Sequence, residues 1–261
     1  MPQTKCLLQI SDTHLVADDR AVISGYHNDQ SFASVLDLAR RHHARIDAIL
    51  ATGDLSDDGS IAAYDRLAWH FSQLDVPVLC LPGNHDTPDN MRLTLNKPPI
   101  RYLGNLNLGS WLIVSLNSHV SGEDGGLIAT DDLDSLKHTL AGHGGPVLIA
   151  IHHPPLLIGS QWLDTVRISN SNQLFIVLSA FPNVKAVIFG HIHQSFSVQL
   201  GQLQLLGCPS TTRQFRPHAD RFAVDNRAPG YRWLHLGPRG GLRTGVRRLN
   251  TSVSHLIRQS E

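Results

Sequence analysis

Polar residues that could bind metal ions and activate water follow five apolar runs of this sequence. Carboxylate oxygens, imidazole nitrogens and an amide oxygen occur there, and together they can ligate a divalent cation and move a proton. The richest group is Gly83-Asn84-His85-Asp86, which follows the apolar run 76–81 and Pro82. The other groups are Asp12 with His14, Asp54, His152 with His153, and His191 with His193.

The donor types narrow the class of metal. Imidazole, carboxylate and amide donors without a thiolate favour Mn, Fe or Zn in an open catalytic site over a structural zinc site. Seven donors are too many for one ion: Asp12, His14, Asp54, Asn84, His152, His191 and His193. They suit two ions that share a carboxylate, lie ~3.5–4 Å apart, and clamp the attacking and leaving oxygens of a phosphoryl transfer.

The segments that carry these groups alternate between predicted strands and helices. Strands are predicted at residues 6–10, 46–51, 76–81, 111–116, 147–151 and 184–189, and helices at 31–45, 60–74, 133–140 and 172–180, with Ser31 as the first N-cap. This alternation predicts a mainly parallel sheet, in which ligands bind beyond the carboxyl ends of the strands. If the first strand continues as extended backbone, Asp12 and His14 leave from the same face.

The pattern of apolar and polar residues changes from Phe196 onward. Short alternating runs with Gly and Pro turns predict an antiparallel second sheet there. Because the polar groups extend from Asp12 to His193, a division of the chain would split the site. We therefore expect one domain over residues 1–261, in which residues 196–249 belong to the second sheet and could form a lid.

Composition argues against several classes of function. Lys plus Arg and Asp plus Glu number 22 each, so the formal net charge is +0, and no basic stripe predicts a nucleic acid polymer or a membrane as partner. No apolar run reaches the ~20 residues of a membrane span and no apolar leader precedes the first strand, so a cytoplasmic protein is expected. Cys6, Cys80 and Cys208 lie in apolar runs, which predicts small buried hydrophobes rather than disulfides or a thiolate metal site.

Histidine is abundant, with 16 residues, and six of these lie in the polar groups. His42, His43, His70, His138 and His143 lie on or near predicted helices and are expected to face solvent. The segment Arg213-Gln214-Phe215-Arg216-Pro217-His218 combines cations with an aromatic ring. It could fold over the site and contact phosphate or base, or it could be a surface loop.

The series Asp12-x-His14, Gly53-Asp54, Gly83-Asn84-His85-Asp86, His152 and Gly190-His191-x-His193 resembles the calcineurin-like metallophosphoesterase superfamily. More narrowly, the chain is similar to the bacterial class III 3′,5′-cyclic nucleotide phosphodiesterases that hydrolyse cyclic AMP. The similarity includes stretches without metal ligands, at residues 162–164, 181–185, 209–211 and 214–218. The resemblance implies an α/β fold: a four-layer αββα sandwich of two mixed sheets flanked by helices.

The resemblance also implies a role for each residue of the site. One ion would be held by Asp12, His14, Asp54 and His193, and the other by Asp54, Asn84, His152 and His191. Asp54 would bridge the two ions. His152 is preferred over His153 because the family's ligand is the first His after the strand. His153 would then orient His152 or stack on substrate.

Asn84 and His85 are the expected catalytic residues. In the family a hydroxide shared by the ions attacks phosphorus, and His85 would stabilise the phosphoryl group or protonate the departing 3′ oxygen. Asp86 is expected to orient His85 or to cap a loop. Substrate contacts are expected from His14, Asp54, Asn84, His85 and His193, with His153, Arg213, Arg216 and His218 as further candidates.

The expected cofactors are two divalent ions, Fe²⁺ or Mn²⁺ before Zn²⁺, Co²⁺ or Mg²⁺. The expected reaction converts cyclic AMP to 5′-AMP and so ends a cyclic nucleotide signal. The alternatives are hydrolysis of other small diesters, such as glycerophosphodiesters or nucleoside 2′,3′-cyclic phosphates, and a non-catalytic scaffold. A homodimer is left open.

Overall fold

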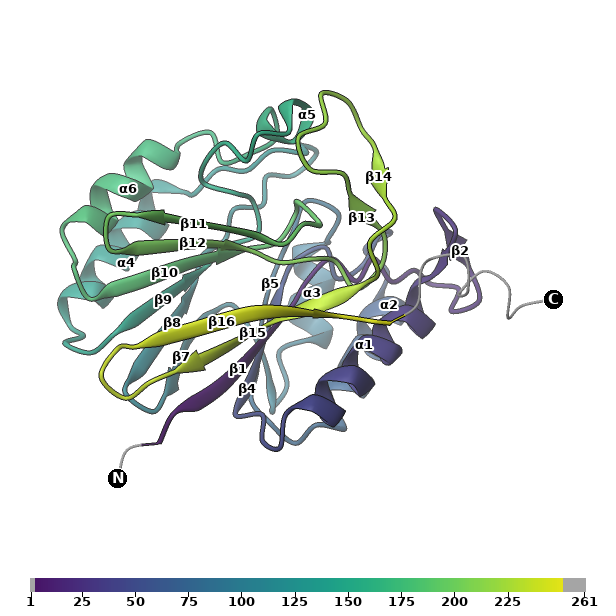
Figure 1. The fold of residues 1–261 in the computed structure, drawn as a ribbon, viewed down its shortest axis with the longest axis horizontal. Helices are drawn as coiled ribbons and strands as arrows, with labels where there is room; N and C mark the ends of the chain where they lie inside the picture. Colours follow the sequence, from purple (N-terminus) through teal and green to yellow (C-terminus); the bar gives the residue numbers. More distant parts are fainter. Residues whose placement is uncertain (1–2, 251–261) are drawn as a thin grey trace.

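The computed structural model describes residues 3–250, which form two six-stranded sheets packed face to face (Figure 1). The first sheet has the order β16 (Leu242–Arg248), β15 (Gly230–Leu236), β1 (Lys5–Ile10), β4 (Ala48–Thr52), β5 (Val78–Leu81), β6 (Ile100–Tyr102). The second has the order β11 (Phe196–Leu200), β12 (Leu203–Gly207), β10 (Val184–Phe189), β9 (Val147–Ala150), β8 (Trp111–Ser115), β7 (Gly104–Leu108). Both sheets are mixed, because β1, β4, β5 and β6 pair in parallel, as do β12, β10, β9 and β8, while β15, β16, β11 and β7 pair antiparallel.

Helices cover the outer faces of both sheets (Figure 1). The first sheet is covered by α1 (Asn28–His42), α2 (Ile61–Ser72) and α3 (Pro88–Thr94). The second is covered by α4 (Thr130–Ala141) and α6 (Ser171–Ser179), and Leu163 of the single turn α5 (Gln161–Asp164) belongs to the same apolar cluster. Two short hairpins complete the structure: β2 (Val22–Ile23) with β3 (Tyr26–His27), and β13 (Gln214–Phe215) with β14 (Val224–Asp225). The expected four-layer fold is confirmed.

The core is built by the twofold alternation of the strands. In β1, Leu7 joins the apolar layer between the two sheets, whereas Cys6 and Leu8 face α1 and α2. All three side chains are buried. Strands that are buried on both faces appear in a sequence as continuous apolar runs. This explains why the predicted bounds of the central strands differ from the observed bounds by two residues at most.

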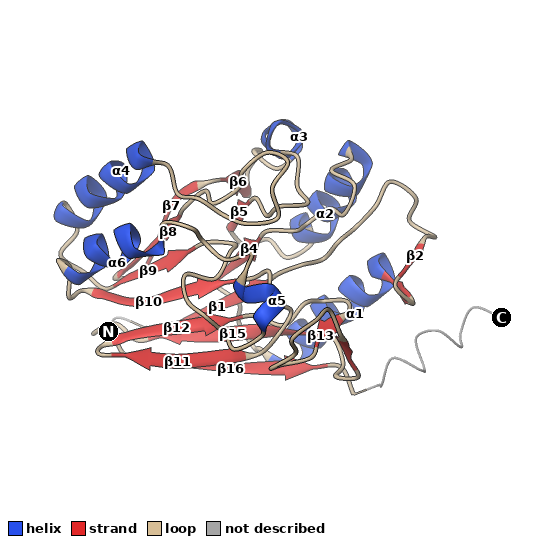
Figure 2. Ribbon diagram, turned by 90° about the horizontal axis from the view of Figure 1, so that it is seen from above, coloured by secondary structure: helices blue, strands red, loops and turns tan. Residues whose placement is uncertain are grey.

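Two buried polar side chains link the sheets. Arg232 of β15 donates from Nε and Nη2 to the carbonyl of Gly207, at 3.2 and 2.9 Å, and from Nη2 to the carbonyl of Phe196 at 2.9 Å. Gln9 of β1 donates to the carbonyl of Phe189 at 3.0 Å. The Arg232 contacts join the β15–β16 hairpin to the β11–β12 hairpin, which lies beside it (Figure 2), and the Gln9 contact joins β1 to β10. We call Arg232 and its carbonyl partners the inter-sheet clasp.

Two expectations differ from the structure. The residues from 196 onward do not form one antiparallel sheet, because β11 and β12 extend the second sheet while β15 and β16 extend the first through β1. Helix α1 begins at Asn28 rather than after a Ser31 cap, since the Ser31 hydroxyl donates to the carbonyl of Thr211 instead.

The organisation as one domain stays a prediction, and residues 251–261 lie outside the described part of the chain. Within residues 3–250, no helix combines the length and the apolar composition that a bilayer crossing requires.

Candidate active site

Loops from both sheets bring the candidate groups together. Asp12 and His14 follow β1, Asp54 follows β4, and Asn84 and His85 follow β5 of the first sheet, while His152 follows β9 and His191 and His193 follow β10 of the second. Contacts cross from sheet to sheet: Asp54 Oδ2 lies 3.3 Å from His152 Nε2, and Asp12 Oδ1 accepts from the backbone N–H of His191 at 3.0 Å. The site therefore lies at the seam between the two sheets, beyond the carboxyl ends of their parallel strands.

The side chains fall into two clusters. In one, Asn84 Oδ1 lies 3.2 Å from His152 Nε2 and 3.0 Å from His191 Nδ1. In the other, His14 Nε2 lies 3.2 Å from His193 Nε2, and Asp12 Oδ1 lies 3.5 Å from the same His193 atom. Asp54 stands between them, because its Oδ2 is also 3.8 Å from His14 Nε2.

Three of the histidines are oriented from behind by acceptors. The Nδ1 contacts are His14 to Asp57 Oδ1 at 2.7 Å, His152 to the Thr52 carbonyl at 2.8 Å, and His193 to the Arg213 carbonyl at 2.8 Å. Because a carbonyl or carboxylate only accepts, we assign the ring proton to Nδ1 in each. The lone pair of Nε2 then faces the centre of the site, which is the usual arrangement of a ligating histidine.

This donor set fits divalent cations. The Nε2 lone pairs of His14 and His193 face each other at 3.2 Å, an arrangement that a cation between them would stabilise. Within the described residues, Asp12 Oδ2 and His191 Nε2 are buried and have no hydrogen-bond partner. Such atoms are costly to bury unpaired. His and Asp side chains of both clusters lie close enough together to hold a metal ion.

Burial and neighbouring charges shift the pKa values of these groups. Burial lowers the pKa of His14 to about 4 and that of His191 to about 3, which favours the neutral imidazole that a metal binds. Burial also acts to lower the pKa of His152, but the adjacent Asp54 carboxylate outweighs it and raises this pKa to about 9. The same pairing holds the pKa of Asp54 well below its usual range against the effect of burial.

Five of the candidate ligands have left-handed backbone conformations. The φ angles are 56° at Asp12, 46° at His14, 49° at Asp54, 66° at His191 and 48° at His193. Such conformations are uncommon for residues with a Cβ atom, cost on the order of 1–3 kcal/mol each, and concentrate at functional sites. The expectation that Asp12 and His14 share the face of an extended strand is therefore wrong, and their side chains converge because the chain turns at both residues.

Asp86 fixes the loop after β5 to the loop after β4. Its carboxylate accepts from the backbone N–H groups of Leu55, Ser56 and Gly83 at 2.9 to 3.1 Å, and from the Tyr64 hydroxyl at 2.9 Å. Burial, followed by the nearby Asp54 charge, raises its pKa to about 6. Of the two roles expected for Asp86, the structure therefore shows the loop cap.

A cavity of about 340 Å³ opens above the two clusters. One side is formed by an aromatic wall, which consists of Trp162, Phe215 and Phe222. The ring centroids of Phe215 and Phe222 lie 5.0 and 5.4 Å from that of Trp162, and Phe215 stacks on His193 at 4.0 Å. The indole N–H of Trp162 is buried and has no partner within the described residues. The cavity thus joins a polar floor to an apolar side, as small-molecule sites commonly do.

The predicted substrate-binding residues differ in their placement. The cavity is lined by His14, Asp54, Asn84, His85, His193 and Arg213. His153 is fully buried, with its Nδ1 2.9 Å from Ser118 Oγ and its Nε2 3.2 Å from the Asp124 carbonyl, so neither nitrogen is free for substrate. Arg216 and His218 are exposed and are not among the lining residues.

Several residues of the site were not predicted. Asp57 orients His14 and lies 3.5 Å from His85 Nδ1 and 3.7 Å from Arg213 Nη2. Trp162 and Phe222 reach the cavity from α5 and from the loop between β13 and β14. Asp57 could have been noticed as a second carboxylate three residues after Asp54, and Trp162 lies in the stretch 162–164 that carries the family resemblance, but Phe222 has no comparable signal in the sequence.

Known proteins resemble this chain along nearly its whole length. The 3′,5′-cyclic adenosine monophosphate phosphodiesterase CpdA of Pseudomonas aeruginosa is 39% identical over 95% of this chain and 91% of its own. A 3′,5′-cyclic-nucleotide phosphodiesterase of Nostoc sp. is 36% identical over 95% of this chain and 93% of its own. The crystal structure of a dimetal phosphatase from Danio rerio superposes with a TM-score of 0.66 at 16% identity, covering 94% of this chain and 99% of the other, which shows the shared fold.

The family model for calcineurin-like phosphoesterases matches residues 7–195, a segment that contains every candidate metal ligand. Together with the two relatives, which match nearly the full length of the chain, this match establishes its family. The chain belongs to the calcineurin-like phosphoesterase family.

Proposed function

We propose that this protein hydrolyses 3′,5′-cyclic AMP to 5′-AMP with two divalent cations. The observation that carries the proposal is one cavity that is lined both by members of the two donor clusters and by the aromatic wall. Cations suit the phosphodiester, and aromatic rings suit a planar base. The names of the relatives from Pseudomonas aeruginosa and Nostoc sp. support this substrate.

Each cluster would hold one ion. Asp12, His14 and His193 would bind the first, Asn84, His152 and His191 the second, and Asp54 would contribute to both. The cations, of which we favour Fe²⁺ and Mn²⁺, would neutralise phosphate charge and provide a water nucleophile at neutral pH. Because the chain has no net charge, these ions would be the largest local source of positive potential.

The residues around the clusters would position the substrate. The guanidinium of Arg213 lines the cavity, and its buried Nε has no partner within the described residues. It can therefore donate to a phosphate oxygen, while Asp57 limits its movement from 3.7 Å. The aromatic wall would hold the base, and the unpaired indole N–H of Trp162 could donate to a ring nitrogen.

His85 is the group that we assign to the leaving oxygen. The net reaction forms a bond from a water oxygen to phosphorus, breaks the bond from phosphorus to the 3′ oxygen, and leaves a proton on that oxygen. His85 lines the cavity and is half-exposed, and its Nδ1 lies 3.5 Å from Asp57. Asp57 can orient the ring so that the other nitrogen faces the substrate, as a general acid requires.

Replacing His85 by Gln should lower kcat for cyclic AMP by about 10²–10⁴-fold, the usual contribution of a general acid. KM and metal content should change little, because His85 is not one of the proposed ligands. Steady-state kinetics and metal analysis of the purified variant test this. His138→Gln on the exposed face of α4 is the matched control and should keep full activity. A His85→Gln enzyme with the kcat of the unchanged protein would exclude the assignment.

The substrate itself is tested by comparing kcat/KM for cyclic AMP, 2′,3′-cyclic AMP, glycerophosphocholine and bis(p-nitrophenyl) phosphate on the Mn²⁺-loaded protein. Cyclic AMP should give the highest value. Phe222→Ala should raise KM for cyclic AMP by roughly 5- to 100-fold, the value of one base–aromatic stack, without affecting glycerophosphocholine, which has no ring. If cyclic AMP is the poorest of the four substrates, the enzyme acts on other diesters and the proposal is wrong.

A further inference from the structure

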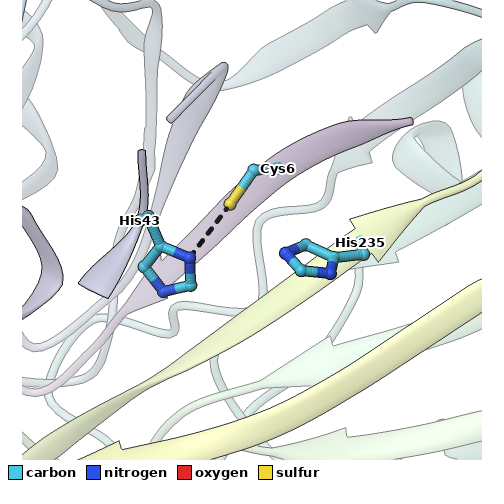
Figure 3. Close-up of side chains that lie close together, drawn as sticks. All are labelled: Cys6, His43 and His235. Carbon is cyan, nitrogen blue, oxygen red and sulfur yellow. Dashed lines mark hydrogen bonds between the residues drawn. The ribbon is translucent and has the colours of Figure 1, made fainter. Parts of the chain in front are cut away.

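A cysteine and two histidines meet on the helix-facing side of the first sheet, outside the candidate active site (Figure 3). Cys6 lies in β1, His235 in β15, and His43 directly follows α1. The antiparallel register pairs Cys6 with His235, so the two side chains are cross-strand neighbours on one face. Asp12 lies six positions after Cys6, beyond the end of β1 at Ile10, and at ~3.3 Å per residue this is a separation of up to ~20 Å. The cluster is therefore a separate feature.

The spacing of these atoms is close to that of a zinc site. Cys6 Sγ lies 3.6 Å from His43 Nδ1. A tetrahedral zinc ion with bonds of about 2.3 Å to sulfur and about 2.05 Å to nitrogen separates those two ligands by about 3.6 Å. One ligand atom from each of the three side chains lies within 4.8 Å of the other two. His235 is only partly buried, so a small side-chain rotation can bring its nitrogen to bonding distance.

The surroundings prepare His43 to act as a ligand. Its Nε2 lies 3.0 Å from the Tyr231 hydroxyl, which can accept the ring proton and leave the Nδ1 lone pair directed at the sulfur. Burial, followed by His235 and Arg247, lowers the pKa of His43 and so favours the neutral ring. Burial and the Asp47 charge raise the pKa of Cys6 to about 11, which argues against a reactive free thiolate.

We propose that Cys6, His43 and His235 bind a zinc ion, with solvent as the fourth ligand. Zinc binds both thiolate sulfur and imidazole nitrogen in tetrahedral geometry. On binding, the Cys6 thiol loses its proton to solvent as the sulfur–zinc bond forms, so no oxidant or reductant is needed. The ion joins the start of β1, the end of α1 and strand β15, which are distant in the sequence. Cys6 is a free and buried cysteine, as expected from the sequence. The expectation that His43 faces solvent is wrong, because its ring is partly buried and contacts Cys6 and Tyr231.

Cobalt titration distinguishes this site from the active site. Co²⁺ replaces zinc in tetrahedral sites, and a sulfur–cobalt bond gives a charge-transfer absorption in the near ultraviolet. The seven candidate ligands of the active site include no thiolate, so this absorption reports Cys6 alone. The unchanged protein should show the band, lose it when Zn²⁺ is added, and bind about one more ion per chain than Cys6→Ser.

Cys6→Ser should lack the band, and His235→Gln, at a partly exposed position, should require at least about 10-fold more Co²⁺ for half saturation. Cys208→Ser is the matched control, because Cys208 is a buried thiol whose sulfur donates to the Gln9 carbonyl, and it should keep the band. Hydrolysis of cyclic AMP should persist in Cys6→Ser, so the two proposals can fail separately. A protein without the band, or a band that persists in Cys6→Ser, would show that the contact is an ordinary thiol–imidazole hydrogen bond.

Discussion

Replacing Asp54 by Asn is expected to lower kcat/KM for cyclic AMP by more than about 100-fold while the fold is retained. Loss of a residue that only supports a metal ligand costs about 10–100-fold in metal affinity or activity, and loss of a ligand should exceed this. Asp54 lies between the two clusters, with Oδ2 3.3 Å from His152 Nε2 and 3.8 Å from His14 Nε2. Asn has the same shape but no charge, so it would weaken both proposed ions at once.

The measurement is kcat/KM at saturating Mn²⁺, together with metal content and circular dichroism. Asn can still accept the backbone N–H of His85, which Asp54 Oδ1 does at 2.9 Å, so the loop after β5 should keep its position. Asp134→Asn on α4, where the exposed carboxylate contacts Lys137, is the charge-matched control and should leave the rate unchanged. Full activity in Asp54→Asn with two ions bound would contradict the shared-ligand assignment.

Gly83→Ala should inactivate the enzyme nearly as strongly, although it removes no polar group. A Cβ atom at Gly83 would lie closer than 3.0 Å to Asp54 Oδ1, to the Asp54 backbone nitrogen and to His152 Cε1. Contacts this short force a displacement, and all three atoms belong to candidate ligands in a close-packed interior. We expect kcat/KM to fall by at least about 100-fold, since a shift of 1 Å at a reacting centre can cost that much.

Metal content should fall together with the rate, because the displaced side chains bind the proposed ions. Gly144→Ala is the control, since no described atom lies within 4 Å of its added Cβ and its φ is not positive. Its stability should stay within about 0.5 kcal/mol of the unchanged protein. If Gly83→Ala turns over cyclic AMP normally, the close packing of Asp54 and His152 against this glycine has no functional role.

The central strands could be predicted because burial on both faces leaves a simple trace in the sequence. Strand β10 was predicted with its observed bounds, Val184–Phe189, and β1 begins one residue earlier than predicted. The start of α1 could not be predicted in the same way. Ser31 is a suitable cap by type, but its hydroxyl binds the Thr211 carbonyl 180 residues away, and that contact exists only in the folded chain.

The residues of the candidate site could be predicted from their types and their order in the sequence. The backbone conformation that brings them together could not. The sequence places Asp12 and His14 after a strand, yet their left-handed backbone depends on tertiary contacts. The N–H of Asp12 donates to the Gly53 carbonyl at 3.0 Å, and that of His14 to the Asp54 carbonyl at 3.0 Å. Local preference alone disfavours such conformations. The path of β15 and β16 back to β1 was missed for a similar reason, because pairing between distant strands leaves little local signal.

The inter-sheet clasp holds together the two sheets that supply the candidate metal ligands. Apolar contact between layers is non-directional, so it resists separation of the sheets better than it resists sliding. The guanidinium of Arg232 is planar, and its N–H groups donate in fixed directions to the carbonyls of Gly207 and Phe196. These hydrogen bonds therefore set the position of one sheet along the other. The candidate metal ligands come from both sheets. Sliding of one sheet along the other would therefore separate these ligands while each sheet stayed folded. On heating, enzymatic activity should then be lost at a lower temperature than the one at which the chain unfolds.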